Sequence, residues 1–176
     1  MSTLTVIVRP NGSGKSTLTR SVDFEGRGQL LDPDSISRGL NPLNPSAKAV
    51  AAGRDVLKRT ADYLNRGVSF AVETTLSSRG RVDLIRKAKP RGYEIHLVSI
   101  GLDSPERCIA RVRNQAALGG RFIPDAGVRR RYARSVANAA QALRLADVAA
   151  FYDNSGDAHR LILVVNATAL PRRKPA

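Results

Sequence analysis

A glycine-rich loop that holds a lysine and two hydroxyls has the residue types needed to bind a phosphate. The stretch "VIVRPNGSGKST", residues 6–17, follows an apolar run and precedes a segment compatible with a helix. In such a loop, backbone N–H groups surround a phosphate, the lysine reaches its oxygens and the next hydroxyl binds magnesium. The pattern therefore predicts nucleotide binding, with a metal ligand at Ser16. The nucleotide-binding residues of this prediction are Asn11, Gly12, Ser13, Gly14, Lys15, Ser16 and Thr17.

Arg9 departs from the phosphate-loop pattern, because it stands where G-x-x-x-x-G-K-[ST] begins with glycine. That position lies at the turn from strand to loop, where a side chain matters if the turn needs a positive φ or close packing. We expect Arg9 to strain the turn without removing a phosphate contact. A glycine-rich turn without a ligand is the alternative, but a buried strand before the loop and a helix after it favour nucleotide binding.

Two acids could take part in the transfer of a phosphoryl group. Asp34 lies in "LDPDS", and a carboxylate that contacts an acceptor hydroxyl can orient or deprotonate it. A helix cap or an Asx turn would explain the same residues. Glu73 ends "FAVE" at the edge where parallel strands place ligands, and the hydroxyls of Thr74 and Thr75 follow it. An acid that only closes a strand is the alternative for Glu73.

Strands and helices alternate along the chain and would bring these residues together. We predict strands over 3–8, 29–31, 68–72, 93–102, 148–153 and 161–167. Helices are predicted over 15–22, from 34 or 35, over 46–65, and in 79–92, where Pro90 and Gly92 break the helix. Two more are predicted, one from 105 to the stop at Gly119 and Gly120, and one after the loop at 119–127 that runs to about 146. Within 46–65, the apolar residues at helical spacing are Val50, Leu57, Ala61 and Leu64. Right-handed βαβ units then form a parallel sheet with helices on both faces.

The length and composition fit one globular domain. The chain has 176 residues, of which 42% are hydrophobic and 25% are charged, which is enough apolar surface for a core. The single cysteine, Cys108, favours a reducing compartment, and no segment resembles a secretory signal or a membrane span, so we expect a cytoplasmic protein. Cys108 is expected to be packed, and His96 and His159 to be structural or surface residues, because the histidines have no partner at catalytic spacing.

The net charge of +14 calls for partners of opposite charge. A nucleic-acid-binding surface and a site for small polyanions would both explain it. Aromatic residues make up only 5% of the chain and tryptophan is absent, which leaves little material for stacking on single strands. The composition therefore favours a small anion over nucleic acid.

Six segments, in order, resemble the zeta toxin family of P-loop kinases, including its short chromosomal members. They are "PNGSGKST", "LDPDSISRGLNP", "AGRDVLKR", "FAVETTLSS", "GYEIHLVSIGLDSPERCIARV" and "GGRFIPDAGVRRRY", and the resemblance covers nearly the whole chain. It implies an α/β fold, a P-loop kinase-like three-layer sandwich, in a single domain over 1–170. It also implies a small arginine-bearing lid over about 111–131. We expect 171–176 to form a disordered tail.

The resemblance further implies a phosphotransferase that uses ATP or GTP with Mg²⁺ to phosphorylate a hydroxyl of a nucleotide sugar, UDP-N-acetylglucosamine being the characteristic acceptor. Asp34 would orient or deprotonate that hydroxyl, while Lys15 and the lid residues Arg111 and Arg121 would neutralise the transferred group. Arg54 would brace Glu73 or hold a substrate phosphate, with a solvated helix arginine as the alternative. The acceptor contacts that the resemblance implies are Asp34, Arg38, Arg54, Glu73, Thr74 and Thr75.

Other features leave further functions open. Gln115 stands where many short relatives carry arginine, and Arg121 where they often carry histidine. At least one of the three adjacent arginines at 129–131 must face solvent, and the turn at 152–156 is either the family's base-binding turn or a plain one. The alternative functions are a nucleic-acid-binding P-loop ATPase and a nucleotide-binding interaction module without transfer activity. For a toxin, the resemblance implies a small, acidic antitoxin that binds over the nucleotide site.

Overall fold

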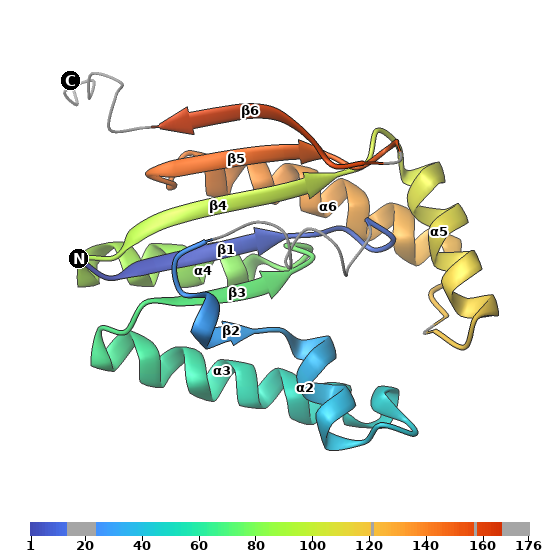
Figure 1. The fold of residues 1–176 in the computed structure, drawn as a ribbon, viewed down its shortest axis with the longest axis horizontal. Helices are drawn as coiled ribbons and strands as arrows, with labels where there is room; N and C mark the ends of the chain where they lie inside the picture. The colour runs from blue at the N-terminus through green and yellow to red at the C-terminus, as the bar shows by residue number, and fades with distance from the viewer. Residues whose placement is uncertain (14–23, 121, 157, 167–176) are drawn as a thin grey trace.

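A six-stranded sheet with the strand order β2-β3-β1-β4-β5-β6 forms the centre of the molecule (Figure 1). The computed structural model describes residues 1–13, 24–120, 122–156 and 158–166. All neighbouring strands pair in parallel except β5 and β6, which are antiparallel. The sheet confirms the predicted α/β, P-loop kinase-like class. The strands are β1 (Thr3–Val8), β2 (Leu30–Leu31), β3 (Phe70–Thr74), β4 (Glu94–Gly101), β5 (Val148–Asp153) and β6 (Arg160–Asn166).

Helices alternate with the strands, as expected from the sequence. α5 begins where predicted, because Ser104 Oγ accepts a hydrogen bond from Arg107 N and Pro105 occupies the first turn. The predicted helix over 15–22 and the predicted tail over 171–176 lie outside the described residues. The described helices are α2 (Pro33–Leu40), α3 (Ala49–Arg66), α4 (Arg79–Ala88), α5 (Pro105–Ala117) and α6 (Asp125–Leu143), with 3₁₀ turns η1 (Arg27–Gln29), η2 (Pro45–Lys48) and η3 (Lys89–Arg91).

The main core lies between one face of the sheet and helices α3, α4 and α6. Leu4, Val6 and Val8 of β1 point to this face and are buried, because alternate side chains of a strand point to the same side. Ile7 points the other way and packs with Ala71 and Ile100 in a smaller cluster. Since β1 is buried on both faces, it reads as a continuous apolar run in the sequence.

The predicted apolar stripe of α3 is only partly correct, because Leu64 packs against the core whereas Ala61 is exposed. A 3₁₀ turn replaces the predicted first turn of this helix, and Val50 and Leu57 are 70% and 64% exposed. The buried side chains of α3 are Ala52, Val56 and Thr60, which repeat every four residues. The sequence prediction relied on large apolar side chains such as Leu57, whereas the smaller side chains of Ala52 and Thr60 are the ones that are buried.

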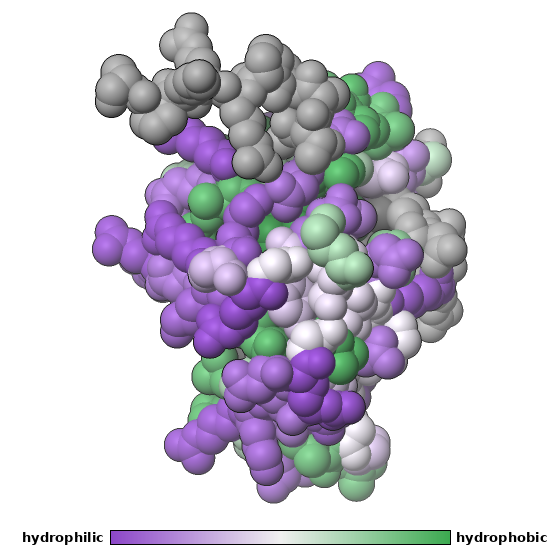
Figure 2. Space-filling model, turned by 90° about the vertical axis from the view of Figure 1, so that its left-hand side faces the viewer, coloured by the Kyte–Doolittle hydropathy of each residue, from purple (hydrophilic) through white to green (hydrophobic). Residues whose placement is uncertain are grey.

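The carboxyl ends of the parallel strands lie together at one edge of the sheet, beside α5 (Figure 1). In open parallel sheets, this edge is where ligands bind. The surface at the other end, toward the amino ends of the strands, is mostly hydrophilic (Figure 2). Within the described ranges, no helix is both long and apolar enough to cross a membrane.

Candidate active site

A cleft with a volume of about 690 Å³ lies among the residues that follow β1, β2 and β3 and residues of α5. Most of the described residues that the sequence marked for binding line it. These are Asn11, Gly12, Asp34, Arg38, Glu73, Thr74 and Thr75. Other polar residues in the lining had not been predicted as site residues. They are Arg9, Asp32, Ser37, Ser46, Ser78, Arg81, Gln115 and Arg131.

The described part of the phosphate loop packs closely against α5. Gly12 has a φ of +78°, and a Cβ at this position would lie 2.7 Å from Cys108 O and 3.3 Å from Arg111 Cβ. Both the backbone conformation and the space therefore require glycine here. Gly14, Lys15, Ser16 and Thr17, which were also predicted to bind nucleotide, lie outside the described residues.

Asn154 joins the turn after β5 to the phosphate loop. It is 7% exposed, and its Nδ2 donates a hydrogen bond of 2.6 Å to Ser13 O. Its main-chain N donates to Gly101 O at 3.0 Å, and its main-chain O accepts from Arg111 Nη2 at 2.8 Å. The turn at 152–156, left open between a base-binding turn and a plain one, thus supports the loop and α5. No sequence signal identified this contact.

Arg9 reaches from the end of β1 to Glu73 on β3. Its Nη1 lies 3.5 Å from Glu73 Oε2, and the two side chains are 1% and 11% exposed. Burial lowers the pKa of Arg9, and the negative charges of Glu73 and Asp32 act in the opposite direction, so the guanidinium keeps its charge. Among the described residues other than glycine, only Leu76 has a positive φ, so the expected strain at Arg9 is absent.

Asp32, rather than Asp34, caps α2. Asp32 Oδ1 accepts a hydrogen bond of 2.9 Å from Asp34 N, so the helix begins one or two residues before the predicted start. Capping therefore does not account for the carboxylate of Asp34, which lies in the first turn and lines the cleft. Arg38, four residues later, lines the same cleft, with its Nη2 3.9 Å from Asp32 Oδ2.

The turn after β3 is held in a strained conformation at the cleft. Leu76 has a φ of 52° and a fully buried side chain, and this left-handed conformation costs about 1–2 kcal/mol for a residue with a Cβ. Thr74 Oγ1 accepts from Leu76 N at 3.0 Å, and Asn138 Nδ2 of α6 donates to Leu76 O at 2.7 Å. Thr75 Oγ1 lies 2.9 Å from Ser77 Oγ. Strain that neighbouring contacts maintain in this way is typical of functional loops.

The arginines that the resemblance singled out do not all reach the cleft. Arg111 contacts Asn154 and does not line the cleft, and Arg54 is exposed on α3 and does not line it either. Arg121 lies outside the described residues. The guanidinium beside Glu73 belongs to Arg9, so the structure does not place Arg54 as its brace.

The three adjacent arginines at the start of α6 point in different directions, as expected. Arg129 pairs with Glu106 of α5, and Arg130 is exposed. Arg131 lines the cleft, and its Nη1 lies 3.5 Å from Asn11 Oδ1. Only this third arginine is therefore in contact with the described part of the phosphate loop.

Arg81 contributes a half-buried cation to the cleft. It lies in the first turn of α4, and it forms no hydrogen bond or ion pair with any residue in the described part of the chain. Burial lowers the pKa of Arg81, with no neighbouring acid to offset it. A cation in the first turn is also disfavoured by the helix dipole, so local helix stability does not explain Arg81.

The remaining candidate groups lie outside this chemistry. Cys108 is fully buried, and burial raises the pKa of its thiol to about 11, which confirms that it is packed. His96 Nε2 of β4 lies 3.2 Å from Glu94 Oε1. Burial, followed by the charges of Arg9 and Arg111, lowers the pKa of His159. In the ranges that the structure describes, no group of three His, Cys, Asp or Glu side chains could hold a metal ion.

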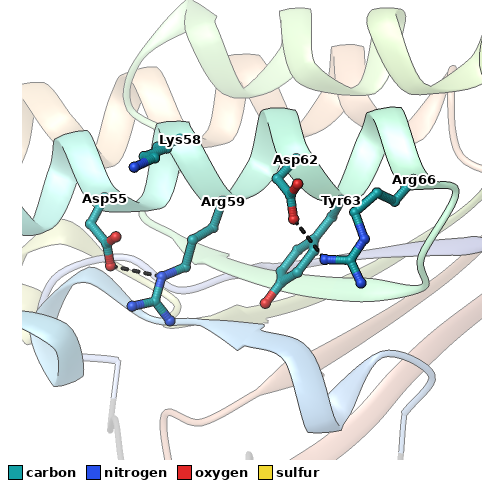
Figure 3. Close-up of a pocket in the computed structure, with 6 residues that line it drawn as sticks. All are labelled: Asp55, Lys58, Arg59, Asp62, Tyr63 and Arg66. Atoms are coloured by element: carbon teal, nitrogen blue, oxygen red, sulfur yellow. Dashed lines mark hydrogen bonds and ion pairs between the residues drawn. The ribbon is translucent and has the colours of Figure 1, made fainter.

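A second hollow, of about 410 Å³, runs along α3 (Figure 3). Its lining residues are Asp55, Lys58, Arg59, Asp62, Tyr63 and Arg66. Arg59 lies 2.9 Å from Asp55, and Arg66 lies 2.9 Å from Asp62, each pair one helical turn apart. These four charges form ion pairs along one solvated helix face, which is typical of a helix surface that such pairs stabilise.

Comparison with known proteins agrees with this geometry. A family model described as zeta toxin matches residues 3–161. An uncharacterized protein of Haemophilus influenzae is 34% identical over 122 residues, which are 69% of this chain and 86% of that protein. The family match supports a phosphotransferase of the kinase type.

Solved structures share the fold at low sequence identity. A chain from the PezAT chromosomal toxin-antitoxin system of Streptococcus pneumoniae has a TM-score of 0.66 at 15% identity, over 98% of this chain and 74% of that one. A chain of the AvrRxo1-ORF1:ORF2 complex with ATP has a TM-score of 0.67 at 17% identity. That match covers 94% of this chain, which spans 59% of the AvrRxo1 chain.

Proposed function

The chain belongs to the zeta toxin family, and on that premise we propose that it is a kinase that transfers the γ-phosphoryl group of ATP or GTP to a hydroxyl of an anionic acceptor, such as the nucleotide sugar UDP-N-acetylglucosamine. One observation carries the proposal: the phosphate-loop residues Asn11 and Gly12 line the same cleft as the carboxylates Asp34 and Glu73. Donor phosphate and acceptor hydroxyl must approach to about 3–3.5 Å, which requires that both bind in one cleft.

The carboxylates have distinct roles in this proposal. Asp34 orients the acceptor hydroxyl and accepts its proton, because its carboxylate lines the cleft while Asp32 caps the helix. Glu73 accepts a hydrogen bond from a second hydroxyl of the acceptor. Lys15, Arg111 and Arg121 neutralise the transferred group, and for Arg111 this means exchanging the carbonyl of Asn154 for a phosphate oxygen.

The lining of the cleft suits substrates that carry negative charge. Its four arginines, Arg9, Arg38, Arg81 and Arg131, outnumber its three acids. A magnesium ion would be held by Ser16, the hydroxyl that follows the loop lysine, together with the nucleotide. When bound, the ion supplies positive charge that stabilises the transferred phosphoryl group.

Arg81 supports an acceptor that carries negative charge. Its guanidinium lines the cleft without a partner in the described part of the chain, and a half-buried charge without compensation lowers the free energy of unfolding. A phosphate or diphosphate beside Arg81 would offset this cost through charge-assisted hydrogen bonds. A nucleotide sugar combines such a diphosphate with sugar hydroxyls that can accept the phosphoryl group.

A transfer assay tests the proposed function. Purified protein is incubated with Mg²⁺ and γ-labelled ATP or GTP against a panel of nucleotide sugars, nucleotides and sugars, and mass spectrometry identifies the products. We expect one phosphate to be added to UDP-N-acetylglucosamine, and this product to be lost in Lys15→Ala and Asp34→Asn. Arg59→Ala, on the solvated face of α3, is the matched control and should retain activity.

The outcomes separate the candidate functions. Nucleotide binding without transfer to any acceptor would favour an interaction module, and turnover stimulated by nucleic acid with a steep salt dependence would favour a nucleic-acid-binding ATPase. Product formation that persists in Asp34→Asn would overturn the role of this carboxylate as the group that accepts the proton.

A small acidic antitoxin is the protein partner that we propose. The PezAT neighbour is part of a toxin-antitoxin system, and a net charge of +14 suits an acidic partner that covers the cleft. We place both proteins in the cytoplasm, where the lone thiol of Cys108 would stay reduced. Co-purification from the source cells at low and high salt tests the partner.

A further inference from the structure

We infer that Arg9 is a positioning residue that holds Glu73 in the orientation needed to bind the acceptor. The inference rests on the proposed kinase function and concerns a residue that replaces the first glycine of the phosphate-loop pattern. In this role, Arg9 acts in the acceptor half of the cleft, which is the part lined by Asp34 and Glu73.

The sheet topology brings Arg9 and Glu73 together. In the order β2-β3-β1, Glu73 is in register with Ile7 of β1, and Arg9 N continues the pairing with a bond of 2.8 Å to Thr74 O. Residues two apart along a strand point to the same side, so Arg9 lies on the side of Glu73. The distance of 3.5 Å between Nη1 and Oε2 is the result.

Stability alone does not explain a buried cation at this turn. Moving a guanidinium out of water carries a desolvation cost that ion pairing only partly repays, and an apolar pair is often at least as stable. Arg9 is compensated by Glu73 and by the charge of Asp32, which come from the ends of two neighbouring strands. Asp32 Oδ1 in turn accepts a hydrogen bond from Asp34 N, so the acid whose charge acts on Arg9 also caps the helix that carries Asp34.

Arg54 provides the competing explanation. The resemblance would make it the brace of Glu73, but Arg54 is exposed on α3, does not line the cleft and pairs with no described residue. The bracing cation therefore comes from the phosphate-loop strand instead of from the helix. The two arginines give opposite predictions for the same assay.

The experiment measures the kinetics of phosphate transfer to UDP-N-acetylglucosamine. The variants are Arg9→Ala, Arg9→Lys, Glu73→Gln and the double variant Arg9→Ala/Glu73→Gln, with Arg59→Ala as the paired surface arginine control. Loss of a charge-assisted hydrogen bond predicts that Arg9→Ala and Glu73→Gln each raise the acceptor KM roughly 10- to 100-fold. The KM for ATP should change less than about twofold, because the substituted side chains face the acceptor half of the cleft.

The double variant and the lysine variant distinguish positioning from a general structural role. If Arg9 acts through Glu73, the double variant is no worse than the poorer single variant. Arg9→Lys should recover part of the acceptor KM, because it keeps the charge but loses the planar fork. If Arg9→Ala fails to fold in a thermal melt, Arg9→Lys and Glu73→Gln decide the question, since both keep a partner in the pair.

Three results would overturn the inference while leaving the proposed function intact. The first is that the Arg9 variants have the same acceptor KM as Arg59→Ala. The second is that the effects of Arg9→Ala and Glu73→Gln on the acceptor KM multiply in the double variant. The third is that Arg54→Ala raises the acceptor KM while Arg9→Ala does not. A wild-type protein that phosphorylates no acceptor overturns the proposed function, and this inference with it.

Discussion

Replacing Asn154 with alanine tests how the phosphate loop is held in place. The substitution removes the hydrogen bond of 2.6 Å from Nδ2 to Ser13 O, which links residues 141 positions apart. It also leaves the carbonyl of Ser13 without this donor, and Ser13 is fully buried. The bonds to Gly101 and Arg111 use the main chain of residue 154 and are retained. The perturbation is therefore confined to one contact.

The expected loss follows from those two effects. The net contribution of the hydrogen bond is about 1 kcal/mol, and the unsatisfied carbonyl adds about 1–2 kcal/mol, so the free energy of unfolding should fall by about 2–3 kcal/mol. In a chain of this length, that lowers the Tm by about 4–12 °C. Nucleotide affinity should fall as well, because Ser13 belongs to the loop that is proposed to bind the phosphates.

Urea unfolding followed by circular dichroism measures the change. Asn154→Asp has nearly the same shape but places a carboxylate oxygen against Ser13 O, so we expect it to be at least as destabilising as Asn154→Ala. Asn65→Ala, an exposed asparagine on α3, is the control and should stay within about 0.5 kcal/mol of wild type. If both variants at 154 match this control, the contact does not hold the loop and the reasoning is refuted.

Three further predictions concern other groups. Arg81→Ala should raise the acceptor KM about tenfold, because it removes a cation that would bind the acceptor, and it should not lower the Tm, because this half-buried charge has no partner among the described residues. An unchanged KM in steady-state kinetics would contradict an anionic acceptor at this position. Iodoacetamide at about pH 8 should modify Cys108 only after unfolding, since the thiol is buried with a pKa of about 11. Mass spectrometry measures the label, and rapid labelling of the native protein would contradict the packing of this thiol and show that α5 opens. The pKa of His159 is lowered on folding, so the unfolded state binds more protons below about pH 6.5 and the free energy of unfolding should fall as the pH drops through that value. Urea unfolding of His159→Gln should show a smaller fall, and a fall equal to that of wild type would exclude this histidine as the cause.

The strands could be predicted because their apolar runs are short and bounded by turns. β1 spans Thr3–Val8 and β5 spans Val148–Asp153, as predicted, and β3, β4 and β6 differ from their predictions by one or two residues at their ends. Helix caps formed by neighbouring residues could also be predicted, as at Ser104, whose hydroxyl accepts a hydrogen bond from the N–H three residues later. In each case, the deciding interactions join residues that are close in sequence.

The buried face of α3 could not be read in the same way. Val50 and Leu57 are large and apolar but exposed, whereas Ala52 and Thr60 are buried. Which face of a helix is buried depends on the angle and distance at which it meets the sheet, and small residues allow closer approach than leucines do. The spacing of apolar residues along the sequence predicts neither the packing angle nor the packing distance.

Local patterns in the sequence were enough to predict the α/β class, to identify the phosphate-loop motif and to mark the acids Asp34 and Glu73 near strand ends, because parallel strands share one edge for their carboxyl ends. Tertiary structure decided which charges meet there. It paired Glu73 with Arg9, directed Arg111 to Asn154 and brought Arg81 into the cleft. Such contacts depend on strand order, register and helix packing. Many arrangements satisfy the same local patterns, so only the folded chain selects among them.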